Sequence, residues 1–204
     1  MINYSGKIEP KENTVVEMLP AGAYIGKILD ATIESVDTSN GSFDRLVLKL
    51  DVTEGEHKDH YTKLYESRSG GMYEAKYKGI MRINIPQSGS PYEQSQKKQL
   101  EHLAWCLQDS NPKYTWDGDE TKLKGLKIGF SVRERDWMME RDGRLSWGTT
   151  TEIGRVESTV KVAAGEVKPM RKRELKDEEK AKIAAYEKAA SDEMTESEDS
   201  DLPF

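Results

Sequence analysis

Aromatic and basic residues alternate over a short segment in the first half of the chain. Tyr61, Lys63 and Tyr65 are separated by single residues, and in a β-strand such residues project from the same face. Aromatic rings stack on unpaired bases of any identity, while Lys neutralises the phosphates between them. A strand over residues 61–66 would therefore suit single-stranded nucleic acid. The alternative is that tyrosines favour strands in general and that the lysine is simply solvated.

Neighbouring segments place further cations at outward positions of predicted strands. Lys49 has this parity in the strand over 44–53, and Lys127 has it in the strand that begins at residue 126. The full set of predicted nucleic-acid-binding residues is Tyr61, Lys63, Tyr65, Lys49, Lys127, Arg133, Arg135 and Trp137.

The sequence contains little that indicates catalysis. His57 and His60 lie among acidic residues and could on paper hold a metal ion, but no second cluster completes such a site. Phosphate-loop, nucleophile-elbow and zinc-protease motifs are absent from the sequence. Cys106 lies beside an apolar helical stripe and is most simply a packing residue. We therefore expect a protein that is not an enzyme and that needs no cofactor or metal.

Strands and one helix account for the middle of the chain. Leu46, Leu48, Leu50 and Val52 alternate strictly, which predicts a strand with one buried face. Ser90, Pro91 and Glu93 suit the start of a helix, and apolar residues recur at helical spacing up to Leu107. Asp142-Gly143 predicts a tight hairpin turn. The expected order is strands over 24–36, 44–53 and 61–66, a helix over 90–111, a strand from 126, and a last strand within 144–156.

Three strands, a helix and two strands are the element order of an OB fold. We therefore expect a mainly β protein built on a five-stranded antiparallel barrel, with one helix between the third and fourth strands. An antiparallel sheet with a covering helix, an α+β domain of no particular binding habit, fits the order equally well. The expected organisation is an N-terminal extension (1–19), the OB-like domain (20–157), a basic linker with a solvated helix (158–190) and a disordered acidic tail (191–204).

Composition and charge limit the classes of protein to consider. The chain has 204 residues, of which 35% are hydrophobic and 33% charged, and one cysteine, which excludes an internal disulfide. We expect a cytoplasmic protein without a membrane-spanning segment or a secretory signal. The net charge of −6 comes from residues 191–204, because residues 1–190 carry 31 acidic and 31 basic side chains. An acidic total therefore does not argue against a nucleic-acid partner.

The chain ends on an apolar motif that a merely solubilising tail does not need. A phenyl ring, a carboxylate and flanking acids make a compact ligand for an apolar pocket with a basic rim. The same acids could also compete with DNA for the groove of the protein itself. The predicted partner-binding residues are Asp199, Asp201, Leu202, Pro203 and Phe204.

Two resemblances support this interpretation. The ending Asp-Ser-Asp-Leu-Pro-Phe resembles the acidic tip of bacterial single-stranded DNA-binding proteins, which usually has isoleucine where Leu202 stands. In that family the tip recruits replication, recombination and repair enzymes. Separately, Leu-Pro-Ala-Gly-Ala-Tyr (19–24), followed by the alternating leucines and Val-Thr-Glu-Gly (52–55), is similar to bacteriophage single-stranded DNA-binding proteins with an OB fold. This second resemblance covers residues 20–157, and no groove residue is carried over from either family.

Together these features predict a phage-encoded protein that binds single-stranded DNA without sequence preference in replication or recombination, in the cytoplasm of a bacterial host. Its partners would be single-stranded DNA and the proteins that bind its acidic tip, and a homo-oligomer is compatible with the sequence. Two alternatives stay open. One is an interaction adaptor without DNA affinity, whose binding would survive high salt. The other is a metal-dependent nuclease built around His57 and His60.

Overall fold

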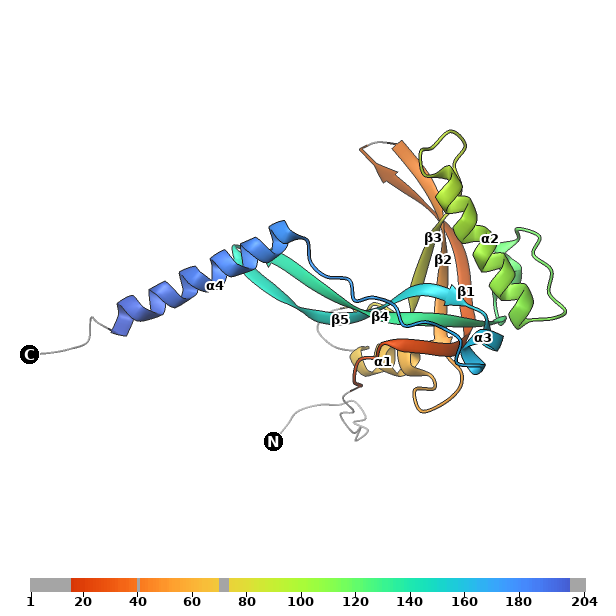
Figure 1. The fold of residues 1–204 in the computed structure, drawn as a ribbon, viewed down its shortest axis with the longest axis horizontal. Coiled ribbons are helices and arrows are strands. Elements are labelled where there is room, and N and C mark those ends of the chain that lie inside the picture. Colours follow the sequence, from red (N-terminus) through yellow and green to blue (C-terminus); the bar gives the residue numbers. More distant parts are fainter. Residues whose placement is uncertain (1–15, 40, 70–73, 199–204) are drawn as a thin grey trace, which may run out of the picture.

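A five-stranded antiparallel sheet forms the centre of the protein (Figure 1). The computed structural model describes residues 16–39, 41–69 and 74–198, with side chains up to residue 189. The sheet order is β3-β2-β1-β4-β5, and β3 and β5 are its two edges. These edges are not hydrogen-bonded to each other in the described residues, so the sheet is open rather than closed into the expected barrel. The strands are β1 (Gly22–Thr38), β2 (Gly41–Val52), β3 (Ile80–Asn84), β4 (Lys127–Arg141) and β5 (Arg144–Glu157).

The third strand differs from the prediction. Residues 61–66 lie in helix α1 (His60–Arg68), and the strand that pairs with β2 is Ile80–Asn84. A short Tyr-x-Lys-x-Tyr alternation does not exclude a helix, because Tyr61 and Leu64 are also three residues apart and share its buried side. The deciding contacts come from β2. The carboxylate of Asp51 accepts hydrogen bonds from the Tyr61 amide at 2.9 Å, the Thr62 amide at 3.0 Å and the Thr62 hydroxyl at 2.5 Å.

The helix predicted between the third and fourth strands is confirmed as α2 (Glu93–Ser110). It begins at Glu93, slightly later than expected. Ser90 Oγ accepts from the Tyr92 amide at 3.2 Å, and the Glu93 carboxylate accepts from the Gly89 amide at 2.8 Å. These bonds hold the turn that precedes the helix rather than its first turn. Figure 1 shows α2 alongside the β1–β2 hairpin, whereas α1 lies at the opposite end of β2.

The inward faces of β1, β2 and β4 form the apolar core. Leu46, Leu48, Leu50 and Val52 are all buried, as their alternation predicts. Phe130 of β4 is fully buried, and its ring lies so close to Gly26 that a Cβ there would come within 2.6 Å of it. Gly26 is therefore needed because the ring occupies the space of a side chain.

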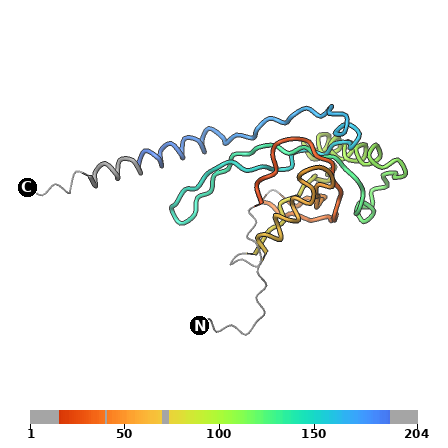
Figure 2. The backbone as a smooth tube through the Cα atoms, turned by 90° about the horizontal axis from the view of Figure 1, so that it is seen from below, coloured from red at the N-terminus to blue at the C-terminus, as the bar shows by residue number. Residues whose placement is uncertain are grey.

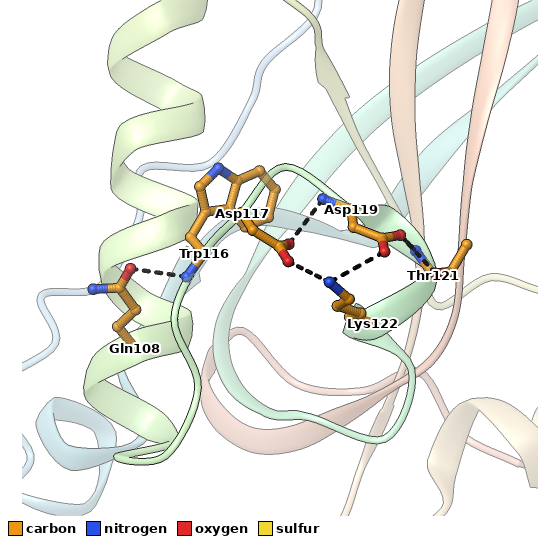
Figure 3. A network of polar contacts seen from close by, with 6 residues as sticks. All are labelled: Gln108, Trp116, Asp117, Asp119, Thr121 and Lys122. Carbon is orange, nitrogen blue, oxygen red and sulfur yellow. Dashed lines mark hydrogen bonds and ion pairs between the residues drawn. The ribbon is translucent and has the colours of Figure 1, made fainter.

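A polar network fixes the loop between α2 and β4 (Figure 3). Gln108 accepts from the Trp116 amide at 3.1 Å, and Asp119 caps the 3-10 helix η1 (Glu120–Leu123) by accepting from the Thr121 amide at 3.0 Å. The Lys122 ammonium lies between Asp117 and Asp119 and lowers the pKa of the Asp117 carboxyl. The pKa of Asp119 is lowered first by the hydrogen bond from the Thr121 hydroxyl and further by Lys122. Lys122 is therefore engaged within the loop.

The chain beyond β5 returns along the sheet before leaving it. Helix α3 (Thr159–Ala163) follows β5 directly, and an extended segment leads to α4 (Asp177–Glu198). Figure 2 shows α4 running outward beside the β4–β5 hairpin. Helix α4 extends to Glu198, and Asp199–Phe204 lie outside the described residues. No helix in the described ranges is long and apolar enough to cross a membrane.

Replacing Asp51 with alanine tests whether this carboxylate holds α1 on the sheet. Asp51→Ala leaves the buried amides at the start of α1 without an acceptor, so we expect the free energy of unfolding to fall by roughly 2–3 kcal/mol. Urea denaturation followed by circular dichroism measures this change. Asp44→Ala on the same strand is the control, because exposed Asp44 accepts a hydrogen bond from Ser35 at 2.6 Å. Equal midpoints for the two variants would contradict the role assigned to Asp51.

Candidate nucleic-acid interface

Lys49 and Tyr65 lie near each other on the outward side of β2 and β3, where both contact a third residue that the sequence does not predict. The residue that joins them is Tyr77, which precedes β3. The Lys49 ammonium lies 4.4 Å from the centre of the Tyr77 ring, and the rings of Tyr65 and Tyr77 are 6.0 Å apart. Arg82 opposes Val47 in the β2–β3 register and so shares the face of Lys49. We call Lys49, Tyr65, Tyr77 and Arg82 the β2–β3 patch.

Tyr61 does not belong to this patch, and its predicted role in base stacking is wrong. Its side chain is 5% exposed, against 39% for Tyr65. Tyr61 packs against Phe130 and lies over Gly79, where a Cβ would come within 2.7 Å of its ring. Burial raises the pKa of the Tyr61 phenol. The ring is part of the core because α1 turns it inward, whereas a strand would have turned it outward.

The two predicted lysines flanking these elements lie apart from the patch. Lys63 is exposed on α1, and its ammonium donates to the Lys58 carbonyl at 2.8 Å. Lys127, at the start of β4, lies 3.9 Å from the carboxylate of Glu54. Helix α3 covers the outward face of β4 just beyond it, since a Cβ at Gly129 would meet Val162 at 2.7 Å. Lys127 is thereby separated from the arginines farther along the strand.

The outer part of the β4–β5 hairpin is an arm with two chemically different faces. Pairing of β1 with β4 ends at Val132, and the hairpin continues beyond it to the turn at Asp142-Gly143 (Figures 1 and 2). Both turn residues have positive φ, at 52° and 72°, as a type I′ turn requires. Strand alternation puts Glu134, Asp136 and Glu140 on one face. The other face, which we call the cationic face, carries Arg133, Arg135, Trp137, Met139, Arg141 and Arg144.

Trp137 lies on the cationic face opposite a glycine, so no side chain faces its ring across the strands. Its cross-strand partner is Gly148, and a Cβ at that position would lie 3.4 Å from the indole ring. The indole therefore rests against the Gly148 backbone. Beyond it, a hollow of about 480 Å³ near the turn is lined by Met139, Arg141, Asp142, Arg144 and Ser146. An aromatic ring and a hollow that contains two arginines thus follow each other along the arm.

The base of the cationic face is held by ion pairs with Glu152 of β5. Arg133 donates to one carboxylate oxygen through Nε at 3.0 Å and Nη2 at 2.8 Å. Arg135 donates to the other oxygen at 3.3 Å. The structure therefore brings the predicted Arg133, Arg135 and Trp137 together on one surface.

Helix α4 and the segment before it pack against the opposite, acidic face of the arm. The Trp147 and Tyr186 rings meet edge to face with their centres 6.1 Å apart. The Lys172 ammonium lies 2.7 Å from Asp136, whose pKa it lowers. Part of the cationic face is also covered, because Met170 fills the space above Gly154 at its base. Met139, at 53% exposure, marks the outer part that stays accessible.

The histidines of the alternative metal site lie within an aromatic cluster. The His57 and His60 rings are 6.4 Å apart and perpendicular, and His57 also contacts Tyr24. His60 is buried, and burial lowers its pKa. Within the described ranges, no group of three or more His, Cys, Asp or Glu side chains is placed to hold a metal ion.

Sequence reasoning missed several residues of this interface, for different reasons. Arg141 shares the parity of Arg135, and Arg144 lies opposite Arg141 across the predicted Asp142-Gly143 turn, so the sequence contains the signal that locates them. No such signal identifies Tyr77 and Arg82, because the sequence predicts the third strand over residues 61–66 and not over residues 80–84. The predicted partner-binding residues Asp199, Asp201, Leu202, Pro203 and Phe204 lie outside the described residues.

Two tyrosine variants distinguish the core from the surface. Tyr61→Ala removes a buried ring, so we expect the free energy of unfolding to fall by roughly 3–5 kcal/mol. Tyr65→Ala removes a half-exposed ring and is expected to cost less than about 1 kcal/mol. Urea denaturation of both variants measures the difference. A stable Tyr61→Ala protein would show that this ring is not part of the core.

Comparisons with known proteins do not identify a family for this chain. No protein-family model matches the chain, and no curated protein matches it. The functional conclusion therefore rests on the geometry of the β2–β3 patch and of the arm.

Proposed function

We propose that the protein binds single-stranded DNA without sequence preference, on the β2–β3 patch and along the cationic face of the arm. The observation that carries this proposal is the position of Trp137. Its indole packs over Gly148, with Arg135 before it on the strand and Met139 and Arg141 after it. A ring fixed in this way stacks on a base without losing side-chain freedom, and the arginines bind the phosphates on either side.

The type of contact explains the proposed lack of sequence preference. Every base has a π-face, so stacking on Trp137, Tyr65 or Tyr77 does not depend on base identity. Phosphate contacts likewise carry no sequence information. Bases stacked within a duplex do not offer their faces to such rings. The surface therefore favours unpaired strands.

The connectivity of the sheet supports an OB-like architecture for this function. An OB barrel opened between its third and fifth strands would have the sheet order found here, with a helix between the third and fourth strands. Helix α2 spans this opening, since His102 Nε2 lies 3.2 Å from the Val156 carbonyl oxygen of β5. OB folds bind oligonucleotides on strands 2 and 3 and on the loop between strands 4 and 5. In an OB-like architecture, the β2–β3 patch and the arm would correspond to these positions.

The acidic C-terminal sequence fits a second part of the same proposal. A protein that coats single-stranded DNA in replication or recombination must also present it to other proteins. The acidic, apolar sequence from Asp199 to Phe204 resembles a segment that has this role in bacterial single-stranded DNA-binding proteins. We further propose that this segment recruits partner proteins. We also propose that the protein is encoded by a bacteriophage.

Replacing Trp137 tests the proposal. Because stacking contributes ~1–3 kcal/mol per base, Trp137→Ala should weaken binding to oligo-dT by about 5-fold to 150-fold. Fluorescence anisotropy of a labelled oligonucleotide measures the affinity. Trp105→Ala is the matched control, because Trp105 is 42% exposed on α2 and contacts Lys161 outside the proposed surface. Equal affinities for the two variants, or no binding by the unaltered protein, would reject the proposal.

A further inference from the structure

Three arginines from two distant parts of the chain surround the carboxylate of Glu152. Arg133 and Arg135 belong to β4, whereas Arg173 lies in the segment between α3 and α4. The guanidinium of Arg173 is 3.7 Å from Glu152 Oε1, farther than a hydrogen bond. Arg135 makes one contact to the same carboxylate, at 3.3 Å. The strong, two-pronged contact to Glu152 is that of Arg133.

Backbone hydrogen bonds fix Arg173 beside Arg135. The Arg173 amide donates to the Glu134 carbonyl, and the Asp136 amide donates to the Arg173 carbonyl, both at 2.9 Å. These bonds form a parallel bridge on the edge of β4 that β1 has left. Alternation then directs Lys172 to Asp136 on the acidic face and Arg173 to Glu152 on the cationic face. The position of Arg173 thus follows from the main chain.

The charges in this cluster are not balanced. Three guanidiniums face one carboxylate, and like charges on adjacent strands repel each other. The side chains of Arg135 and Arg173 are 44% and 58% exposed, so both can reach a ligand. A guanidinium has five N–H donors, and Arg135 and Arg173 use few of them within the cluster. An anion with several oxygens would satisfy both the charge and the donors.

We propose that Arg133, Arg135 and Arg173 around Glu152 form a phosphate-binding site that holds one phosphodiester of a bound single strand. Arg135 and Arg173 contact the phosphate, while Arg133 holds Glu152 in place between them. The inference rests on the proposed function and extends the DNA-binding surface beyond the sheet, to the segment that leads into α4. Trp137 follows Arg135 on the same face, about 7 Å along the strand. A base stacked on Trp137 and a phosphate at the cluster can therefore come from neighbouring positions of one strand.

Salt titrations of two single variants test this site. Arg173→Ala removes one phosphate contact, so the slope of log affinity for oligo-dT against log salt should become shallower by about 0.7. Affinity should fall roughly tenfold at low salt. Arg171→Ala is the matched control, since it removes the same charge from the same exposed segment. Its slope should match that of the unaltered protein.

A second measurement separates this site from the proposed function. Inorganic pyrophosphate is titrated into the full chain while the arginine Nε–Hε signals are followed by NMR. Saturable shifts of Arg135 and Arg173, with Arg171 unchanged, are expected. If these shifts occur but oligo-dT does not bind, the phosphate site stands and the proposed function fails. If oligo-dT binds but Arg173→Ala and Arg171→Ala give equal slopes, the phosphate site is rejected and the proposed function stands. Absence of the pyrophosphate shifts also rejects the site.

Discussion

The buried carboxylate of Asp51 determines how the aromatic residues of this protein are divided between core and surface. By accepting hydrogen bonds from the first residues of α1, it fixes the helix at the end of β2. The helix then turns Tyr61 into the core and leaves Tyr65 beside Tyr77. A buried carboxylate is costly unless its oxygens are satisfied, and the amides at a helix N-terminus satisfy them well. The position of Tyr65 in the β2–β3 patch depends on these hydrogen bonds.

The arm is a two-stranded ribbon that carries charged residues on both faces but leaves the outer part of one face exposed. Alternation separates the acids, Glu134, Asp136 and Glu140, from the arginines. Lys172 and the Trp147–Tyr186 contact attach the C-terminal segment to the acidic face. An isolated ribbon of two strands is marginally stable, so this packing also supports the arm. The cationic face beyond Arg135 is consequently available to a polyanion.

The same segment contributes the third arginine of the cluster around Glu152. Edge strands offer unpaired backbone groups, and the chain uses the free edge of β4 to position Arg173 rather than leaving it open. The proposed phosphate site and the protection of this edge thus depend on the same pair of backbone hydrogen bonds. The cost is the repulsion between adjacent guanidiniums, which Glu152 offsets in part.

The sequence by itself determined only local features of the structure. The alternation of Leu46, Leu48, Leu50 and Val52 identified β2, Asp142-Gly143 identified the hairpin turn, and the parity of Arg133, Arg135 and Trp137 placed them on one face. Each of these follows from the geometry of a single strand or turn, so nearby residues suffice to predict it. Tertiary structure decided that residues 61–66 are helical, that Tyr77 joins Lys49 to Tyr65, and that Arg173 lies beside Arg135. These outcomes depend on contacts between different elements, such as Asp51 of β2 with Thr62 of α1 and Arg173 with Glu134 of β4, which local periodicity does not encode.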